Sequence, residues 1–550
     1  MRYPTPASPF TSLRSLHRLA LAVAIAGSIF SPLTRAASAG AVGIFATHAD
    51  IGLTPTAGSA VFDAAKKSYT VTGGGNNIWA KVDAFHFAWK QLSGDVSFSA
   101  DIEFLPNTAG VSDPHRKACL MIRQSLDADA AYIDAALHGN GLTALQFRDA
   151  KGGPTREVMS NIIGPVRLRI EKRGDVFTLF LGQAGEDPKY SGASYNLKFT
   201  EPFYIGLAVG AHNGNDTSTM VEAVTFSNVE LKTNLPAGTP KLYSTLETQV
   251  SNPVNANGTQ NTDRCVLYVT EGSIEGPVWL PDNSGVVFSR GGKLMRLPMK
   301  VPARAARGAA GTPPPPAPVL GASPLADGAP VAIDTGKVTG ISRTHGLSPD
   351  GTQIIFVDHP PGNPRPPANT FIVPIAGGTP RLLTPTTGAG SSLAPDGKLF
   401  AFDTDTVADI YTIPTDGSGP ATRLTNGQGQ KNCGPQFSHD GSFILFCSDR
   451  SGSMQIWRMK PDGSEPTQVT HDDNANWFPR ISSNDASALV VSYPKSVVGD
   501  PANSLVQLRR VNLANGTIDL MARVTGGPAS APTWSPTNTQ ITFVSYQMVY

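Results

Sequence analysis

The sequence has 550 residues, which is too long for one ordinary hydrophobic core and favours two or three domains. Its 55 glycines and 46 prolines, together with only 16% charged residues, favour many short strands joined by tight turns. The formal net charge of +1 excludes the strongly basic surface with which proteins bind nucleic acid or acidic membranes.

Residues 1–39 have the pattern of a secretory signal peptide. Basic residues around Arg14 precede an apolar run at 19–30, and the small residues 37–39 form a cleavage site. The apolar run is short for a membrane span, so we expect cleavage after Ala39, with an uncleaved anchor as the alternative. The expected mature protein is periplasmic or secreted, with no membrane span after cleavage.

Short alternating segments follow between residues 44 and 234. About ten of them have the alternation of half-buried strands, and none has a helical pattern. This organisation predicts an all-β class with an N-terminal jelly-roll sandwich.

One hairpin of this region can be read in register, because the letters HGNG predict its turn. The pairing then places Tyr132 opposite Arg148 and Asp134 opposite Gln146, with alanines between them. Arg123, on the preceding strand, joins this face. Polar side chains around small residues and an aromatic ring suit a carbohydrate, and the alternative is the ordinary solvated face of a half-buried sheet.

A repeat fills the region 241–550. Six copies combine Pro, an apolar or aromatic residue, Ser, a Pro-Asp-Gly type of turn and an alternating apolar run. The Asp of the turn or its substitute lies at Asp282, Asp350, Asp396, Asp440, Asn484 and Thr537. A period near 44 residues with four short strands in each unit predicts a propeller of six blades.

The first and last copies depart from the regular period. A Pro/Ala-rich stretch, 300–330, lengthens the first copy and is expected to be a surface insertion or, as the alternative, a ligand for a partner. The last copy has only its first two strands. We expect the strand-like segments that begin at Lys241 and Arg264 to complete it, so that both ends of the propeller segment close the ring.

Four cysteines are present, too few for a disulfide framework. Cys433 and Cys447 flank a hairpin centred on Asp440 and should face each other across two strands. A cross-strand disulfide and a pair of buried thiols both fit this placement. The spacing is not that of a zinc site.

The repeats, with phrases such as SPDG and SDRSGSMQIWRMKPDGSEPTQVT, resemble the six-bladed propeller of TolB-like proteins. The phrases CLMIRQSLDADAAYIDAALHGNGLTALQFR and FYIGLAVGAHN resemble a concanavalin A-like jelly roll. The mature chain thus resembles exported bacterial proteins of the TolB family that place such a sandwich before the propeller. This resemblance implies fold more strongly than activity, and TolB itself has a different N-terminal domain.

Propeller ligands usually meet the mouth of the central channel, so the segments that enter the first strand of each blade supply the candidate ligand-binding residues. These residues are Glu275, Arg343, His345, Asn432, Asn476, Trp477 and Arg480. Core packing is the alternative for Trp477, and a structural hydrogen bond is the alternative for His345.

We expect an exported, non-catalytic binding protein, monomeric, with a protein partner or a glycan at the propeller mouth. No catalytic residue, metal or cofactor is predicted. The alternative is a carbohydrate-active enzyme of the polysaccharide lyase or hydrolase type at the channel mouth, although the sandwich lacks the Glu-x-Asp-x-x-Glu string of glucanases. A peptidase role is least favoured, because a hydrolase segment with Gly-x-Ser-x-Gly is not found.

Overall fold

The computed structural model describes residues 40–107, 112–164, 166–214, 217–251, 264–300, 326–359, 368–384, 388, 390–404, 408–427, 429, 431–527 and 531–550. The predicted signal peptide and most of the Pro/Ala-rich insertion, residues 301–325, lie outside the described residues. Within the described part, the chain forms 38 strands and no helix, which confirms the all-β class.

Two sheets make up the N-terminal region. The first consists, in spatial order, of β12 (Lys189–Asn196), β11 (Val176–Gly182), β10 (Arg167–Arg173), β5 (Val96–Phe104), β14 (Glu222–Thr233), β3 (Ser68–Gly73) and β2 (Ser59–Asp63). The second begins with β1 (Thr47–Ile51), β4 (Phe85–Leu92), β13 (Phe203–Gly210), β6 (Lys117–Arg123), β7 (Tyr132–His138), β8 (Leu142–Arg148) and β9 (Arg156–Ile163).

One hydrophobic core lies between these two sheets. Phe98 and Phe226 enter it from β5 and β14, and Leu120, Ile133 and Leu145 enter it from β6, β7 and β8. All five side chains are buried. Because side chains alternate along a strand, every second residue of each strand can join this core, as the alternating sequence pattern predicts.

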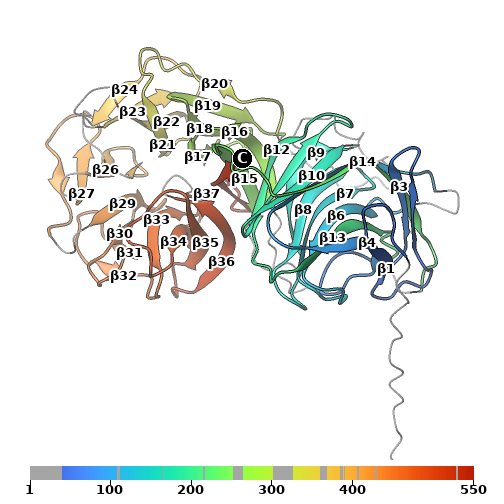
Figure 1. Cartoon of the computed structure of the whole chain (residues 1–550). Helices are drawn as coiled ribbons and strands as arrows, with labels where there is room; N and C mark the ends of the chain where they lie inside the picture. Colours follow the sequence, from blue (N-terminus) through green and yellow to red (C-terminus); the bar gives the residue numbers. More distant parts are fainter. Residues whose placement is uncertain are drawn as a thin grey trace, which may run out of the picture. The chain divides into compact units, whose positions relative to one another are not determined.

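Five separate four-stranded sheets follow along the chain (Figure 1). They are β17 (Ile274–Trp279), β18 (Gly285–Arg290), β19 (Lys293–Pro298) and β20 (Val331–Ala332); β21 (Ile341–Leu347), β22 (Gln353–Asp358), β23 (Asn369–Pro374) and β24 (Arg381–Thr384); β25 (Ser391–Leu393), β26 (Leu399–Asp403), β27 (Ile410–Pro414) and β28 (Thr422–Arg423); β29 (Asn432–Phe437), β30 (Ile444–Ser448), β31 (Gln455–Met459) and β32 (Thr467–Gln468); and β33 (Ala475–Ile481), β34 (Ser487–Tyr493), β35 (Ser504–Asn512) and β36 (Ile518–Gly526).

The repeated aspartate shapes the turn between the first two strands of these sheets. The Oδ1 of Asp350 accepts a hydrogen bond from the backbone N–H of Thr352 at 3.1 Å, and Asp440 does the same for Ser442 at 2.9 Å. The glycine after Asp440, Gly441, has a φ of +74°, which residues with a side chain rarely adopt. At Asp350 and Asp440 the Asp-Gly pair therefore forms the turn by the mechanism that the sequence predicts.

A further set of four strands pairs in order: β37 (Thr533–Trp534), β38 (Gln540–Val549), β15 (Lys241–Val250) and β16 (Arg264–Glu271). β15 pairs with β38 along its whole length, which is the pairing that the sequence predicts for the segment at Lys241. Figure 1 shows β15 and β37 close to the C-terminal end.

This set is not a separate sheet. Arg264 and Cys265 of β16 continue into a short parallel pairing with Val158 and Met159 of β9, so the four strands extend the second N-terminal sheet to eleven strands. The structure therefore has five separate four-stranded sheets where the sequence predicts six. The physical reason is that the outer edge of β16 finds a backbone partner in β9, which removes the gap that would separate a sixth sheet.

Cys433 and Cys447 face each other across β29 and β30, as the sequence predicts. Both thiols are nevertheless free and buried, and the Sγ of Cys447 lies 2.9 Å from the backbone oxygen of Cys433. Of the two readings that the sequence left open, the structure has the pair of buried thiols.

Candidate functional site

The innermost strands of the five sheets, together with β37, line a cavity of about 470 Å³, which we call the channel cavity. Each of these six strands contributes at least one side chain to the wall of the cavity. Representative residues, in chain order, are Trp279, His345, Ser391, Phe437, Arg480 and Trp534. The volume lies within the usual range of ligand pockets. Most of the wall is aromatic, apolar or hydroxyl-bearing.

His345 is buried in the wall of the channel cavity. Its Nδ1 lies 2.5 Å from the hydroxyl of Ser391, and its Nε2 has no hydrogen-bond partner among the described residues. Burial holds the pKa of His345 well below its ordinary value, and the positive charges of Arg343 and Arg480 act in the same direction. The imidazole is therefore neutral at pH 7, and its Nε2 is buried without a hydrogen-bond partner among the described residues.

Arg480 supplies a positive charge to the same cavity. No carboxylate of the described residues lies within ion-pair distance of its guanidinium. Burial, with a contribution from Arg343, lowers the pKa of Arg480 to about 10, so the group is still charged at pH 7. Arg480 is half-buried. A half-buried cation without a counterion is unfavourable, and an anion in the cavity would relieve that cost.

Glu275 and Arg343 do not line the channel cavity, but they form an ion pair with Nε to Oε2 at 3.8 Å. Both side chains are about 30% exposed, at 28% and 29%. Burial raises the pKa of Glu275, and Arg343 opposes that rise. Arg343 is thus partly neutralised by Glu275, whereas Arg480 is not.

Asn432 is buried outside the channel cavity, contrary to the prediction. Its Nδ2 donates to Oδ1 of Asp409 at 2.9 Å, and the hydroxyl of Thr425 donates to the same oxygen at 2.5 Å. Thr425 also accepts from the backbone N–H of Ile410 at 3.0 Å. Asn432 therefore joins one sheet to the next.

Asn476 repeats this arrangement one sheet further along the chain. Its Nδ2 donates to Oε1 of Gln455 at 3.0 Å, and the hydroxyl of Thr470 donates to the same oxygen at 2.7 Å. Thr470 accepts from the backbone N–H of Ile456 at 2.9 Å. The recurrence of the network gives both asparagines a structural role in the repeat, and neither is among the residues that line the channel cavity.

Trp477 also lies outside the channel cavity, in the hydrophobic core of the fourth and fifth sheets. It is only 3% exposed, its ring lies 5.7 Å from that of Phe478, and the ammonium of Lys431 lies 4.7 Å from its centre. Core packing, the alternative in the sequence analysis, is what the structure shows for Trp477.

Sequence reasoning missed the aromatic lining of the cavity. Trp279, Phe437 and Trp534 occupy the same position of the repeat, directly before the residue that opens the turn. The sequence does indicate these residues, because each copy of the repeat has an apolar or aromatic residue at this position. Sequence alone does not distinguish an apolar residue that faces the channel from one that packs in the core.

The hairpin of the N-terminal region has the predicted register, with Tyr132 opposite Arg148 and Asp134 opposite Gln146. Arg123 lies opposite Tyr132 on β6. All five side chains are buried, however, so they do not form an open face for a carbohydrate. This corrects the expected sugar-binding face.

A distant carboxylate explains why this face is closed. Arg148 donates to both oxygens of Asp83, at 2.6 and 2.8 Å, and Arg123 lies 3.6 Å from Asp83. The hydroxyl of Tyr132 lies 3.2 Å from that of Thr155. The polar face is therefore satisfied internally by residues from other parts of the chain.

Asp134 is the exception on this face. Neither of its carboxylate oxygens has a hydrogen-bond partner among the described residues, and the same holds for Oε1 of Gln146 opposite. Burial raises the pKa of Asp134 to about 8, although Lys117 acts in the opposite direction. The carboxyl group is thus largely protonated at pH 7.

The described residues contain no group of three His, Cys, Asp or Glu side chains that could hold a metal ion. In the same part of the chain, no helix has the length and apolar character needed to cross a membrane.

Several solved structures are similar to parts of this chain. The putative TolB from Agrobacterium tumefaciens is 29% identical, with 56% of this chain and 99% of that chain covered and a TM-score of 0.46. TolB from Acinetobacter baumannii is 13% identical, with 68% and 78% covered and a TM-score of 0.30. Oligogalacturonate lyase from Vibrio parahaemolyticus is 11% identical, with 50% and 91% covered and a TM-score of 0.30.

Sequence comparison gives the family. The model of the TolB beta propeller domain matches residues 332–549. The uncharacterized protein Atu1656 of Agrobacterium fabrum is 33% identical over 288 residues, which are 51% of this chain and 87% of that protein. The chain therefore belongs to the same family as that Agrobacterium protein and is a TolB-like β-propeller protein.

Proposed function

We propose that this protein is an exported, non-catalytic binding protein whose channel cavity holds an acidic peptide segment of a partner protein. One observation carries the proposal: Arg480 brings a positive charge without a paired carboxylate into a cavity of about 470 Å³. A TolB-like propeller is a protein-binding fold, which agrees with a binding role.

The chemistry of the wall supports an acidic peptide. A carboxylate beside Arg480 would gain a charge-assisted hydrogen bond in a site with little water, where such bonds are strong. His345 lies in the same wall, and its Nε2 is buried without a partner among the described residues. Trp279, Phe437 and Trp534 supply the apolar surface that packs against the rest of the segment.

The same proposal includes a ring of six blades. The strands β37, β38, β15 and β16 pair in the order of the other sheets, and β37 contributes to the channel wall beside the five inner strands. In this proposal they serve as the sixth blade although β16 also contacts β9. The domain boundaries proposed are 44–234 for a concanavalin A-like sandwich and 241–550 for the propeller.

Export rests on the amino-terminal pattern of residues 1–39 described above. Cleavage of that segment would deliver the mature chain to the periplasm or to the medium. A fractionation of cells that express the full chain tests this, because a mature protein beginning after residue 39 should be recovered outside the cytoplasm.

A carbohydrate-active enzyme is the second candidate, and one observation favours it. The neutral His345, whose Nε2 is buried and unpartnered among the described residues, lies in the wall of a cavity that also contains Arg480. Exposure of that nitrogen to a substrate would give a base beside a cation that holds a carboxylate. Incubation with polygalacturonate, with and without a chelator, should then give unsaturated products that His345→Ala abolishes. Absence of such products from the wild-type protein would remove this candidate.

Calorimetric titration with two matched peptides tests the binding proposal. Hexaglutamate should bind, whereas hexaglutamine should not, because only the former brings a carboxylate to Arg480. Arg480→Met should weaken hexaglutamate binding about tenfold or more, as expected for loss of a charge-assisted hydrogen bond. Arg381→Met, on the exposed outer strand β24, is the control and should bind like wild type. Equal binding of the two peptides would contradict the proposal.

A further inference from the structure

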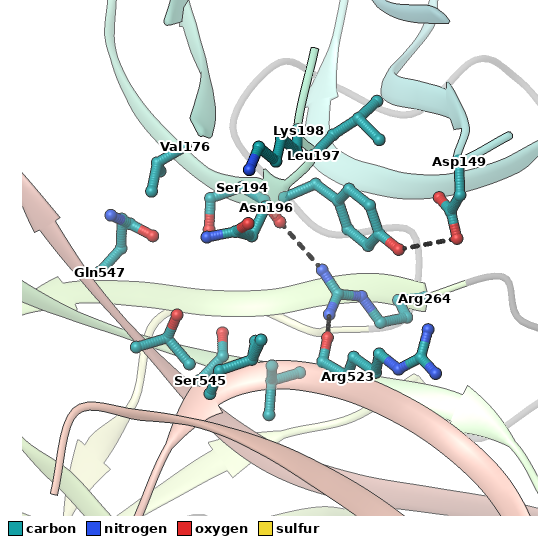
Figure 2. Close-up of a pocket in the computed structure, with 14 residues that line it drawn as sticks. Asp149, Val176, Ser194, Asn196, Leu197, Lys198, Arg264, Arg523, Ser545 and Gln547 are labelled. Atoms are coloured by element: carbon teal, nitrogen blue, oxygen red, sulfur yellow. Dashed lines mark hydrogen bonds between the residues drawn. The ribbon is translucent and has the colours of Figure 1, made fainter. Parts of the chain in front are cut away.

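A second cavity, of about 320 Å³, lies where the N-terminal sheets meet the last strands of the chain (Figure 2). One wall comes from the end of β12 and the residues after it, 194–198. The other comes from β16, β36 and β38. We call it the junction cavity.

Arg264 links the two walls of the junction cavity. Its guanidinium donates to the backbone oxygen of Ser194 at 3.2 Å on one side and to that of Arg523 at 3.3 Å on the other, as Figure 2 shows. Its Nε lies 3.1 Å from the buried Glu247, which also accepts a hydrogen bond from the hydroxyl of Ser545. Arg264 is therefore neutralised and fixed.

Two other cations of the junction cavity are not neutralised. Lys198 and Arg523 lie on opposite walls, both are exposed, and no ion pair to either occurs among the described residues. The one carboxylate of the lining, Asp149, is already engaged by Arg156 at 3.0 Å and by the hydroxyl of Tyr195 at 3.1 Å. The cavity thus carries an excess positive charge that an anion can balance.

The rest of the lining is suited to hydroxyl groups and to a small apolar surface. Asn196 and Gln547 offer side-chain amides, and Thr525 offers a hydroxyl. Leu197 and Val524 add apolar contacts. Amides that both donate and accept, beside apolar patches, are what the hydroxyls and the ring of a sugar require.

We propose that the junction cavity binds a small acidic sugar of the hexuronate type. The positive charges of Lys198 and Arg523 would attract the carboxylate, and the hydroxyls would meet Asn196 and Gln547. A nucleotide fits less well, because the ring of Tyr195 is already stacked on Phe147 with centres 3.6 Å apart. The volume lies at the lower end of the range of ligand pockets, which suits one or two sugar units rather than a polymer segment.

The location gives the ligand a second effect. Because the sugar would contact both walls, its binding energy adds to the contacts of Arg264 that hold the walls together. A ligand that binds only the native arrangement stabilises it by mass action. Galacturonate should therefore raise the melting temperature as well as bind.

Titration of the mature protein with galacturonate, and with galactose as the neutral analogue, tests this proposal. Galacturonate should bind and galactose should bind at least tenfold more weakly, since one charge-assisted contact is worth about that factor. Lys198→Gln and Arg523→Gln should each weaken galacturonate binding about tenfold. Both residues are exposed, so their replacement should leave the melting temperature without ligand unchanged.

Two controls keep the result specific. Lys189→Gln removes an exposed lysine from the other end of β12, outside the junction cavity, and should bind like wild type. Arg480→Met, in the channel cavity, should also leave galacturonate binding unchanged. The proposal is overturned if galactose binds as well as galacturonate, if Lys189→Gln causes the same loss, if inorganic phosphate binds in place of the sugar, or if no binding is detected at millimolar galacturonate.

Discussion

The Nδ1 of His345 lies 2.5 Å from the hydroxyl of Ser391, although 46 residues separate them in sequence. The contact joins β21 to β25, two neighbouring inner strands of the propeller. It uses one ring nitrogen and leaves the other without a partner among the described residues. The hydrogen bond between the two strands thus fixes the imidazole of His345 in the wall of a cavity that also contains the charge of Arg480.

Arg480→Met should make the protein more stable while it weakens binding. Burial lowers the pKa of Arg480 to about 10, so the charged form is penalised in the native state and not in the unfolded state at every pH below about 10. Replacement by an apolar residue removes that penalty, and we expect a gain of about 1–2 kcal/mol in the free energy of unfolding. Urea denaturation at pH 7 measures it, and a loss of stability would show that Arg480 is structural.

Asp134→Asn should stabilise the protein more at pH 8.5 than at pH 5. The raised pKa of about 8 means that native Asp134 keeps its proton up to about pH 8, whereas the unfolded chain loses it near pH 4. Stability therefore falls as pH rises between these values, and the asparagine variant lacks this fall. Urea denaturation at the two pH values gives the difference, and a pH-independent effect of the substitution would contradict the assignment.

His138 should cause a loss of stability in acid. Burial, assisted by Lys117, lowers the pKa of His138 to about 3. Between pH 6.5 and 3 the unfolded chain therefore binds a proton that the native state does not, and stability falls with decreasing pH. At pH 5 the cost is about 2 kcal/mol. His138→Gln should flatten the pH dependence of unfolding in this window, and an unchanged slope would exclude His138 as its source.

The strand β15 should be essential to the propeller. Leu246 is fully buried among side chains of the first four-stranded sheet and of β38, so Leu246→Ala should cost about 2–5 kcal/mol. Leu505→Ala changes a leucine that is 51% exposed and should cost less than about 0.5 kcal/mol. Thermal unfolding followed by tryptophan fluorescence compares them, and similar melting temperatures would show that β15 does not support the propeller.

The turns and the strand registers were predictable because their causes are local. The Asp-Gly turns depend on neighbours within two residues, and the hairpin of Tyr132 and Arg148 is fixed by its turn. The pairing of β15 with β38 was predictable for another reason, since an incomplete repeat leaves a strand edge that needs a partner.

Which candidate side chains face the channel cavity was not predictable in the same way. The pairing of β33 with β34 shifts register between Trp477 and Arg480, and that of β29 with β30 shifts after Cys433. Such an irregularity changes which side chains face inward, and the sequence shows no clear signal for it. Arg480 consequently lines the channel cavity while Asn476 and Trp477 do not.

The sequence pattern also did not predict that the polar face around Tyr132 and Arg148 is buried. Asp83 neutralises Arg148 across 65 residues of sequence. A periodic pattern shows which residues share a face, but it does not show what covers that face.

A crystal structure of the mature protein soaked with hexaglutamate tests the central claim most directly. The account predicts a carboxylate of the peptide in the channel cavity, within hydrogen-bond distance of the Arg480 guanidinium. Peptide bound on the outer surface, with the channel cavity holding only water, would contradict it.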